Sequence, residues 1–321
     1  MRAICLTKYG SIDNFIRTDI PTPAPKRGQV RVRVHSSAVG PADFKVAMGL
    51  VKFLHGRKFP MVLGYDFSGV VDGVGERQSR WKIGDSVFGF LPYGPGNNQG
   101  AFAEFLIAHE DQVAMKPASI SHEQAAASAT ATLTALQGLR GEGNLPLVKS
   151  HVLITGASGA VGSTSITVAK KLGAYVTAVG SQRGLELAKR HGADIVIDRK
   201  QSDILEQADH SYDVIFDAAA AYRWSQWKTK LKPGGRFVTP LPSPAFAADK
   251  LLSLFASSSA QFVGIVKSRN KDLELLAKWL GEGFEVSIDS TLPVREVAKG
   301  VLQYQKRDFV GRIVVDVANG F

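Results

Sequence analysis

The chain has 321 residues, of which 45% are hydrophobic and 21% charged, the balance of an ordinary soluble globular protein long enough for two domains. Its single cysteine, Cys5, excludes an internal disulfide, and its 7 scattered histidines lack metal-binding spacing. The net charge of +10 is diffuse and forms no basic stripe interleaved with aromatic residues. This disfavours a specific nucleic-acid partner and favours an anionic cofactor or a loose contact with acidic membrane lipids.

The hydropathy of the chain predicts its location. No apolar run approaches the length of a membrane span, and Met1–Leu6 has the pattern of a strand and not that of a signal peptide. We therefore expect a cytoplasmic protein without an integral membrane segment.

The first third of the chain consists of short β-type segments separated by turn residues, a pattern typical of a small β barrel or folded sheet. The expected strands are Ala3–Leu6, Val30–Ser36, Val70–Val74, Ser86–Phe90 and Phe102–Ile107. From Ser121 the pattern changes, and an alanine-rich helix is expected over Ala125–Leu139.

Strands and helices then alternate from His151 to Lys267, which predicts a doubly wound parallel sheet of six strands. The expected strands are Val152–Thr155, Ala174–Val179, Asp194–Asp198, Tyr212–Ala218, Arg236–Thr239 and Gln261–Val266. Three prolines, Pro240, Pro242 and Pro244, predict that the connection after the fifth strand is a stiff loop and not another helix.

The first strand of this sheet ends in a glycine-rich turn that leads into a helix. Read from Ala157, the turn is A-x-G-x-x-G, one methyl group away from the usual dinucleotide-binding pattern G-x-G-x-x-G. Such a turn needs small residues because its backbone must approach a pyrophosphate held by free N–H groups at a helix start. The cofactor-binding residues that it predicts are Gly156, Ser158, Gly159, Ala160, Val161 and Gly162.

The end of the second strand of the sheet distinguishes between the two nicotinamide dinucleotides. NAD sites usually carry an Asp or Glu there, about 20 residues after the turn, for the ribose 2′-hydroxyl. This chain has Ser181 and Arg183 at that place, and Arg199 follows the third strand. Because a guanidinium pairs with a 2′-phosphate, the sequence predicts NADPH.

The last segment carries two expected helices, Asp272–Trp279 and Val294–Gln305, and a final strand, Gly311–Val317. These elements are too few to fold alone. We expect them to return to the β-rich first domain, giving domain limits of 1–117 with 268–321, and 118–267.

Taken together, these segments resemble the medium-chain dehydrogenase/reductase superfamily, and within it the zinc-free quinone oxidoreductase-like branch. The resemblance covers nearly the whole chain. It rests on the glycine turn and on Val39–Lys45, Leu63–Val71, Gly84–Val87, Gly100–Phe105, Leu133–Leu136 and Asp308–Val315. It implies a Rossmann domain between the halves of a GroES-like β-rich domain formed by both chain ends.

The chain departs from the family pattern in two respects. Zinc-dependent relatives place His then Glu where this chain has Tyr65 and Asp66, and their structural zinc needs cysteines that are absent here. No metal is therefore expected. Gly40 stands where the branch usually has Asn, so one polar contact to cofactor or substrate is expected to be lost.

The resemblance implies hydride transfer from NADPH to a quinone, or alternatively to the double bond of an enone or alkenal. Tyr65 and Tyr93 are candidate donors of a hydrogen bond or proton, with simple packing as the alternative. Thr134 matches a position near the nicotinamide, and Asp43 and Lys45 match positions lining the substrate cleft. Asp43 is equally compatible with capping a turn, and Lys45 with a solvated surface position.

Two further possibilities stay open at this stage. Some relatives of this branch suggest a protein that binds NADPH without significant turnover. The apolar segment Ala245–Ala260 is expected either to wall a substrate pocket or to pack at a homodimer interface, which in this superfamily often joins the sixth strands, here near Gln261–Val266.

Overall fold

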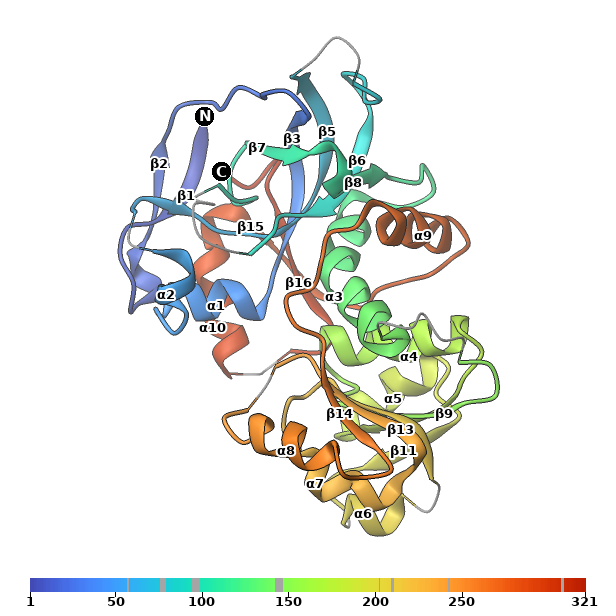
Figure 1. Cartoon of the computed structure of the whole chain (residues 1–321). Helices are drawn as coiled ribbons and strands as arrows, with labels where there is room; N and C mark the ends of the chain where they lie inside the picture. Colours follow the sequence, from blue (N-terminus) through green and yellow to red (C-terminus); the bar gives the residue numbers. More distant parts are fainter. Residues whose placement is uncertain are drawn as a thin grey trace. The chain divides into compact units, whose positions relative to one another are not determined.

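A computed structural model describes residues 1–56, 58–75, 79–93, 99–141, 147–201, 203–208, 211–241, 243–306 and 309–321, and for Leu54 only the backbone. Asp308 and Pro242, used above, lie outside this part of the chain. The described chain divides into two compact units, Met1–Thr130 with Lys267–Phe321, and Ala131–Val266 (Figure 1). This division falls inside helix α3 (His122–Arg140), whereas the sequence placed a domain limit at residue 117, and the domain limits stay a prediction.

The first unit is built from two sheets. Its larger sheet has the order β15-β16-β3-β5-β6-β8, with β7 also paired to β3, and its smaller sheet has the order β2-β1-β4. The strands are β1 Arg2–Leu6, β2 Phe15–Asp19, β3 Gln29–Val39, β4 Met61–Val62, β5 Asp66–Val74, β6 Ser86–Phe90, β7 Phe105–His109, β8 Val113–Met115, β15 Ile288–Pro293 and β16 Arg312–Asp316. The helices are α1 Pro41–Ala47, α2 Lys52–His55, α9 Asn270–Gly281 and α10 Val297–Lys306, with 3₁₀ turns at Ile12–Asn14, Glu110–Gln112 and Val294–Glu296.

Both ends of the chain build this unit, as the sequence predicted. The last strand, β16, pairs antiparallel with β3, so that Val314 lies opposite Ala38 (Figure 1). A strand from the N-terminal part of the chain and the last strand of the chain therefore lie side by side in one sheet.

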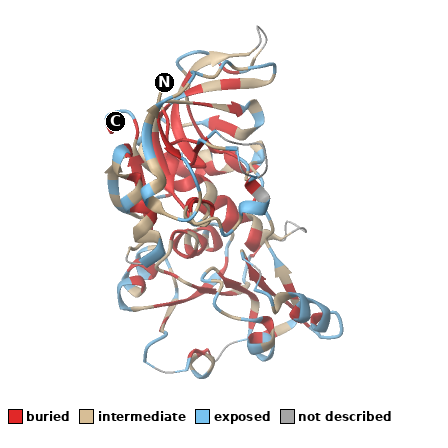
Figure 2. Cartoon of the chain, turned by 90° about the vertical axis from the view of Figure 1, so that its left-hand side faces the viewer, coloured by how far each residue is buried: buried red, intermediate tan, exposed pale blue. Residues whose placement is uncertain are grey.

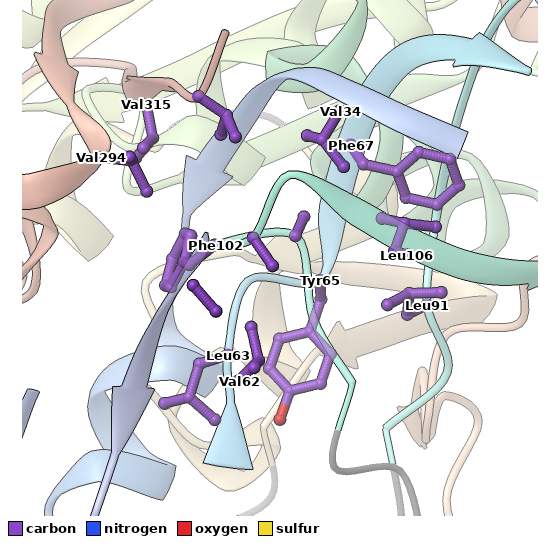
Figure 3. Close-up of a cluster of buried hydrophobic side chains, with 14 of the residues drawn as sticks. Val34, Val62, Leu63, Tyr65, Phe67, Leu91, Phe102, Leu106, Val294 and Val315 are labelled. Carbon is purple, nitrogen blue, oxygen red and sulfur yellow. The ribbon is translucent and has the colours of Figure 1, made fainter. Parts of the chain in front are cut away.

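The core of the first unit is apolar and continuous. Val34, Phe67 and Leu106 come from three neighbouring strands and are at most 2% exposed, and Val294 and Val315 bring in the C-terminal segment (Figure 3). Figure 2 shows the burial of each residue, with buried residues on the strands and exposed residues on the outer turns. Burial of this apolar surface is the main favourable term for the unit.

The first unit also contains a buried ion pair. The Arg312 guanidinium on β16 donates from Nη2 to Asp66 Oδ2 at the start of β5, and the two residues are 2% and 3% exposed. The other oxygen, Asp66 Oδ1, accepts the backbone N–H of Thr130 on α3 at 2.7 Å. A carboxylate removed from water needs such partners, so this pair fixes β5, β16 and α3 together.

The second unit is a six-stranded sheet in the order β11-β10-β9-β12-β13-β14, with all pairs parallel. In sequence order this is 3-2-1-4-5-6, the order of a doubly wound dinucleotide-binding fold, as predicted. The strands are β9 His151–Thr155, β10 Tyr175–Gly180, β11 Ile195–Asp198, β12 Tyr212–Asp217, β13 Leu231–Thr239 and β14 Ser259–Phe262. The connections contain α4 Ala160–Lys171, α5 Gln182–Arg190, α6 Ile204–Gln207, α7 Trp224–Trp227, a 3₁₀ turn Lys228–Lys230 and α8 Phe246–Ser253.

One expectation for this sheet was wrong. The connection after β13 was predicted to lack a helix, yet it contains α8, which begins two residues after Pro244. Proline disrupts a helix at its own position and in the turn that precedes it in the chain. An alanine- and leucine-rich stretch that follows the proline can therefore be helical. The prolines restrict the backbone only in the first residues of the connection.

Replacing Arg312 with Met is expected to lower the free energy of unfolding by about 3–5 kcal/mol, because it leaves the Asp66 carboxylate buried without its cation. Chemical denaturation measures this. The double variant Asp66→Leu/Arg312→Met should recover part of the loss, and Arg17→Met, at an exposed arginine of β2, is the control. A loss in the Arg312 variant no larger than in the control would show that the pair does not stabilise the fold.

Candidate active site

The turn after β9 is shaped by glycine. Gly156 has φ +69°, a left-handed conformation that side chains disfavour, and a Cβ there would lie 2.9 Å from the backbone nitrogen of Ala219. A Cβ on Gly162 would clash with the carbonyl oxygen of Gly156. These two glycines therefore let α4 start directly against the end of β9.

The amino terminus of α4 is open. Its N-cap residue, Gly159, has no side chain to cap it, and a Cβ there would meet only the Gly156 carbonyl oxygen, at 3.5 Å. Within the described residues, the N–H groups of Ala160, Val161 and Gly162 donate no hydrogen bond. Three free amides and a space that a Cβ would fill suit the negative oxygens of a pyrophosphate, so this turn fits a dinucleotide.

The polar residues predicted around the turn lie at the same edge of the sheet. Ser158 packs against α5, where a Cβ on Gly184 would lie 2.7 Å from the Ser158 Cβ. Ser181 is the N-cap of α5, and Arg183 is exposed in its first turn. Arg199 follows β11, is exposed, and its N–H donates to the Gly180 carbonyl oxygen at the end of β10 at 3.0 Å. The two arginines thus follow neighbouring strands.

A buried carboxyl group that the sequence reasoning missed lies beside the turn. Asp217, at the end of β12, is 0% exposed, and its Oδ1 accepts the Thr155 hydroxyl at 2.5 Å. Its Oδ2 accepts the N–H of Tyr222 at 2.8 Å, which holds the loop that contains Ala219 against Gly156. Burial raises the pKa of Asp217 against these hydrogen bonds. The available signal was an aspartate at the carboxyl end of an apolar strand, where sites in parallel sheets gather.

Thr134 is 7% exposed on α3, within the second unit. A helix residue that packs in the interior of a protein has this degree of burial, so the burial alone does not indicate a cofactor contact. Its predicted place near a nicotinamide stays a prediction.

In the first unit Asp43 is a turn-forming residue. It is 1% exposed, its Oδ2 accepts the Gly40 N–H at 2.7 Å, and its Oδ1 accepts the Gly64 N–H at 2.8 Å. Burial raises its pKa to about 7, while the two N–H groups act in the opposite direction. Both carboxylate oxygens are occupied by backbone amides, which favours the capping alternative over contact with a substrate. The half-buried Lys45 lies two residues further along α1, where burial lowers its pKa.

The two candidate tyrosines lie together. The Tyr65 and Tyr93 rings have centroids 4.4 Å apart, Tyr65 is 5% exposed, and Tyr93 is half-buried. In Figure 3 the Tyr65 hydroxyl points away from the side chains of Phe67 and Leu91. Burial raises the pKa of both hydroxyls, and the carboxylates of Asp43 and Asp66 raise it further, for Tyr65 and Tyr93 respectively. Both are therefore neutral donors at pH 7.

Metal ligands are not gathered in the part of the chain described above. No group of three or more His, Cys, Asp or Glu side chains there is arranged to hold a metal ion. Likewise, no described helix is long and apolar enough to cross a bilayer.

Comparison with known proteins gives the family. Residues 26–118 match the alcohol dehydrogenase GroES-like domain, and residues 191–315 match the zinc-binding dehydrogenase family. The chain is 31% identical over 252 residues to a chloroplastic quinone-oxidoreductase homolog of Spinacia oleracea, covering 76% of each chain. It is 36% identical over 225 residues to 2-methylene-furan-3-one reductase of Solanum lycopersicum, covering 68% of this chain and 57% of that protein.

A solved structure agrees over the full length. The quinone oxidoreductase from Coxiella burnetii superposes with a TM-score of 0.87 at 26% identity and covers 99% of both chains. The chain therefore belongs to the quinone oxidoreductase-like branch of the medium-chain dehydrogenase/reductase superfamily. It is an oxidoreductase of that superfamily, whose members bind a nicotinamide cofactor.

The two glycines of the turn are expected to respond differently to alanine. Gly162→Ala should lower the free energy of unfolding by roughly 1–3 kcal/mol, because α4 must move away from Gly156. Gly159→Ala should cost less than about 1 kcal/mol, yet should weaken dinucleotide binding about tenfold, because its methyl fills the space over the free amides. Denaturation and NADPH fluorescence titration measure the two effects. Unchanged affinity in Gly159→Ala would contradict the placement of the pyrophosphate.

Proposed function

We propose that the chain is an NADPH-dependent reductase of quinones. The observation that carries the choice of cofactor is the pair of exposed arginines, Arg183 and Arg199, after the neighbouring strands β10 and β11. No carboxylate occupies the end of β10, where Gly180 is followed by Ser181 and Gln182. Asp198, at the end of β11, accepts the N–H of Lys200 at 2.9 Å. This edge therefore favours a 2′-phosphate over a free ribose hydroxyl.

The proposed acceptor rests on the relatives and on the tyrosine pair. A quinone-oxidoreductase homolog and the Coxiella burnetii quinone oxidoreductase are among the similar proteins, which supports a quinone. The similarity to 2-methylene-furan-3-one reductase supports an enone as the second candidate. Both acceptors are electron-poor π systems whose reduction places negative charge on an oxygen.

The residues of the chain have limited tasks in such a reaction. NADPH supplies the hydride, so the protein must bind, orient and shield the reactants and donate a hydrogen bond to the developing oxyanion. The α4 amides and the arginines bind the cofactor in this proposal. We assign the donor role to the neutral hydroxyl of Tyr93, which is the less buried residue of the pair as a whole. Asp43 holds the turn at Gly40 and Gly64, next to Tyr65, and acts as a positioning residue.

We also propose that two copies of the chain pair through β14. This strand forms one edge of the six-stranded sheet. Large apolar side chains on and around it are exposed, namely Leu251, Leu252, Leu254, Phe255, Phe262 and Ile265. An open strand edge beside such a surface favours self-association. A cytoplasmic location stays a prediction, since the spinach relative is chloroplastic.

The cofactor proposal predicts a selective effect of Arg183→Gln. NADPH should bind about 10-fold to 100-fold more weakly, because a charge-assisted contact to the 2′-phosphate is lost, whereas NADH affinity should change little. Fluorescence titration with both cofactors measures the difference. Arg190→Gln, in the last turn of the same helix, is the matched control. Equal losses for both cofactors in Arg183→Gln would contradict a phosphate-binding role.

The acceptor is tested by NADPH oxidation with 1,2-naphthoquinone and with a simple enone. We expect the quinone to be reduced with the higher kcat/KM, since two of the three similar proteins above are named as quinone oxidoreductases. Turnover of the enone alone would select the second candidate. An NADPH fluorescence change without oxidation by either acceptor would instead indicate a cofactor-binding protein.

In the same assay Tyr93→Phe should lower kcat by about tenfold or more while leaving NADPH affinity unchanged. Tyr222→Phe is the control, because Tyr222 makes its described hydrogen bond to Asp217 through the backbone. A Tyr93 variant as active as wild type would remove that hydroxyl from the mechanism.

A further inference from the structure

Two strands, β7 and β16, pair with successive stretches of the same edge of β3. A cavity lies at the point on β3 where one pairing ends and the other begins. β7 pairs with residues 29–33 of β3, and β16 pairs with residues 36–39 (Figure 1). Between them the backbone remains bonded, because Val34 N–H donates to Glu104 O and Val317 N–H donates to His35 O, each at 2.9 Å. The residues around this point border a partly open cavity of about 300 Å³, a volume at the small end of ligand pockets. We call this space the fork cavity.

The charged residues of the fork cavity are unequally paired. Its lining includes Arg2, Arg33, His35, Glu104, Phe105 and Val317. Arg2 Nε donates to Glu104 Oε1 at 2.7 Å, so these two charges neutralise each other. Arg33 makes no side-chain hydrogen bond or ion pair with any residue of the described chain. Among the residues that line the cavity, Arg33 therefore supplies one positive charge that no lining carboxylate pairs.

Arg31, the neighbouring arginine on β3, differs from Arg33 because it has a carboxylate partner. Arg31 lies two residues before Arg33 and so on the same face of the strand. Its guanidinium is bound to Asp72, with Nη2 2.6 Å from Oδ2, and Nε donates to the same oxygen at 2.7 Å. The strand thus provides a carboxylate partner for Arg31 and none for Arg33.

His35 is the third polar residue of the cavity. Its ring centroid lies 4.4 Å from that of His122 on α3, whose Nδ1 is 2.7 Å from the Ser68 hydroxyl. Burial lowers the pKa of His35, as do Arg33 on its own strand and Lys116, while Asp316 on β16 and Glu123 on α3 raise it. Burial also lowers the pKa of His122, to about 4. Both rings are neutral at pH 7, and an anion beside His35 would favour its protonation.

We propose that the fork cavity is a binding site for a small organic monoanion, with the carboxylate on Arg33 and His35 and an apolar body against Phe105 and Ala318. The single uncompensated charge matches a monoanion. The apolar part of the lining, which also includes the largely buried Val34 and Val317, matches a hydrocarbon body more closely than an inorganic ion. This site lies within the first unit and does not depend on the cofactor or acceptor proposed above.

Benzoate is the probe, with benzamide and inorganic phosphate for comparison, titrated calorimetrically into the full chain at pH 7. Benzoate should bind, and Arg33→Gln should weaken it at least tenfold, because the charged partner is lost. Arg17→Gln, at an exposed arginine of β2 outside the cavity, should bind as wild type. An unchanged melting temperature of Arg33→Gln would show that the exposed side chain is not needed for folding.

Dependence on pH gives a second readout. Since bound carboxylate raises the pKa of His35, benzoate affinity should increase as the pH falls from 7 to 6, and this increase should be absent in His35→Gln. Benzoate is essentially ionised throughout that range, so the probe itself contributes no titration. Binding that is insensitive to Arg33→Gln, or equally tight for benzamide, would overturn the carboxylate site. Equally tight phosphate would overturn the apolar half of the proposal.

Discussion

The ion pair between Asp66 and Arg312 joins residues that are 246 positions apart in the sequence. Removing two charges from water is unfavourable, and the fold offsets this by giving Asp66 a second partner, the Thr130 N–H, and by placing Tyr304 beside Arg312. The pair therefore requires β5, β16 and α3 to be in place at once. It commits the C-terminal segment to the sheet that the N-terminal segment begins.

The electrostatic setting of the tyrosines depends on this arrangement. Asp66 directly follows Tyr65, and its carboxylate is one of the groups that raise the pKa of Tyr93. Asp43 acts on Tyr65 in the same way while holding the Gly40 and Gly64 amides. Two neutral hydroxyl donors beside two buried carboxyls form a site in which a proton stays on oxygen until a stronger base develops. That property suits a reductase whose product is first an oxyanion.

The second unit uses the backbone where the first uses side chains. Its candidate cofactor site consists of free amides at the start of α4, and the glycines on either side allow the close approach of helix and strand. Side-chain chemistry enters only at the edge, through Arg183 and Arg199, and behind the turn, through Asp217. In the proposed function, cofactor binding and proton donation thus belong to different units, and we expect that each can be altered by substitutions that leave the other unchanged.

Local patterns in the sequence were enough for the elements whose cause is local. The glycine turn, the six alternating strands and the helix α3 follow from residue type and spacing, because steric freedom at glycine and hydrophobic periodicity act over a few residues. The error at α8 arose where a local signal, proline, was extended beyond the residues that it constrains.

Long-range partners were outside the reach of such patterns. Nothing near Asp66 in the sequence indicates that Arg312 will pair with it, that Asp43 will cap Gly64, or that Asp217 will bind Thr155. The sequence by itself determined the two kinds of sheet and the glycine turn after β9, since these depend on neighbours in the chain. Only the tertiary structure decided which charges are buried and which, like Arg33, are left without a partner in the described chain, because pairing depends on strands that meet across the sheet.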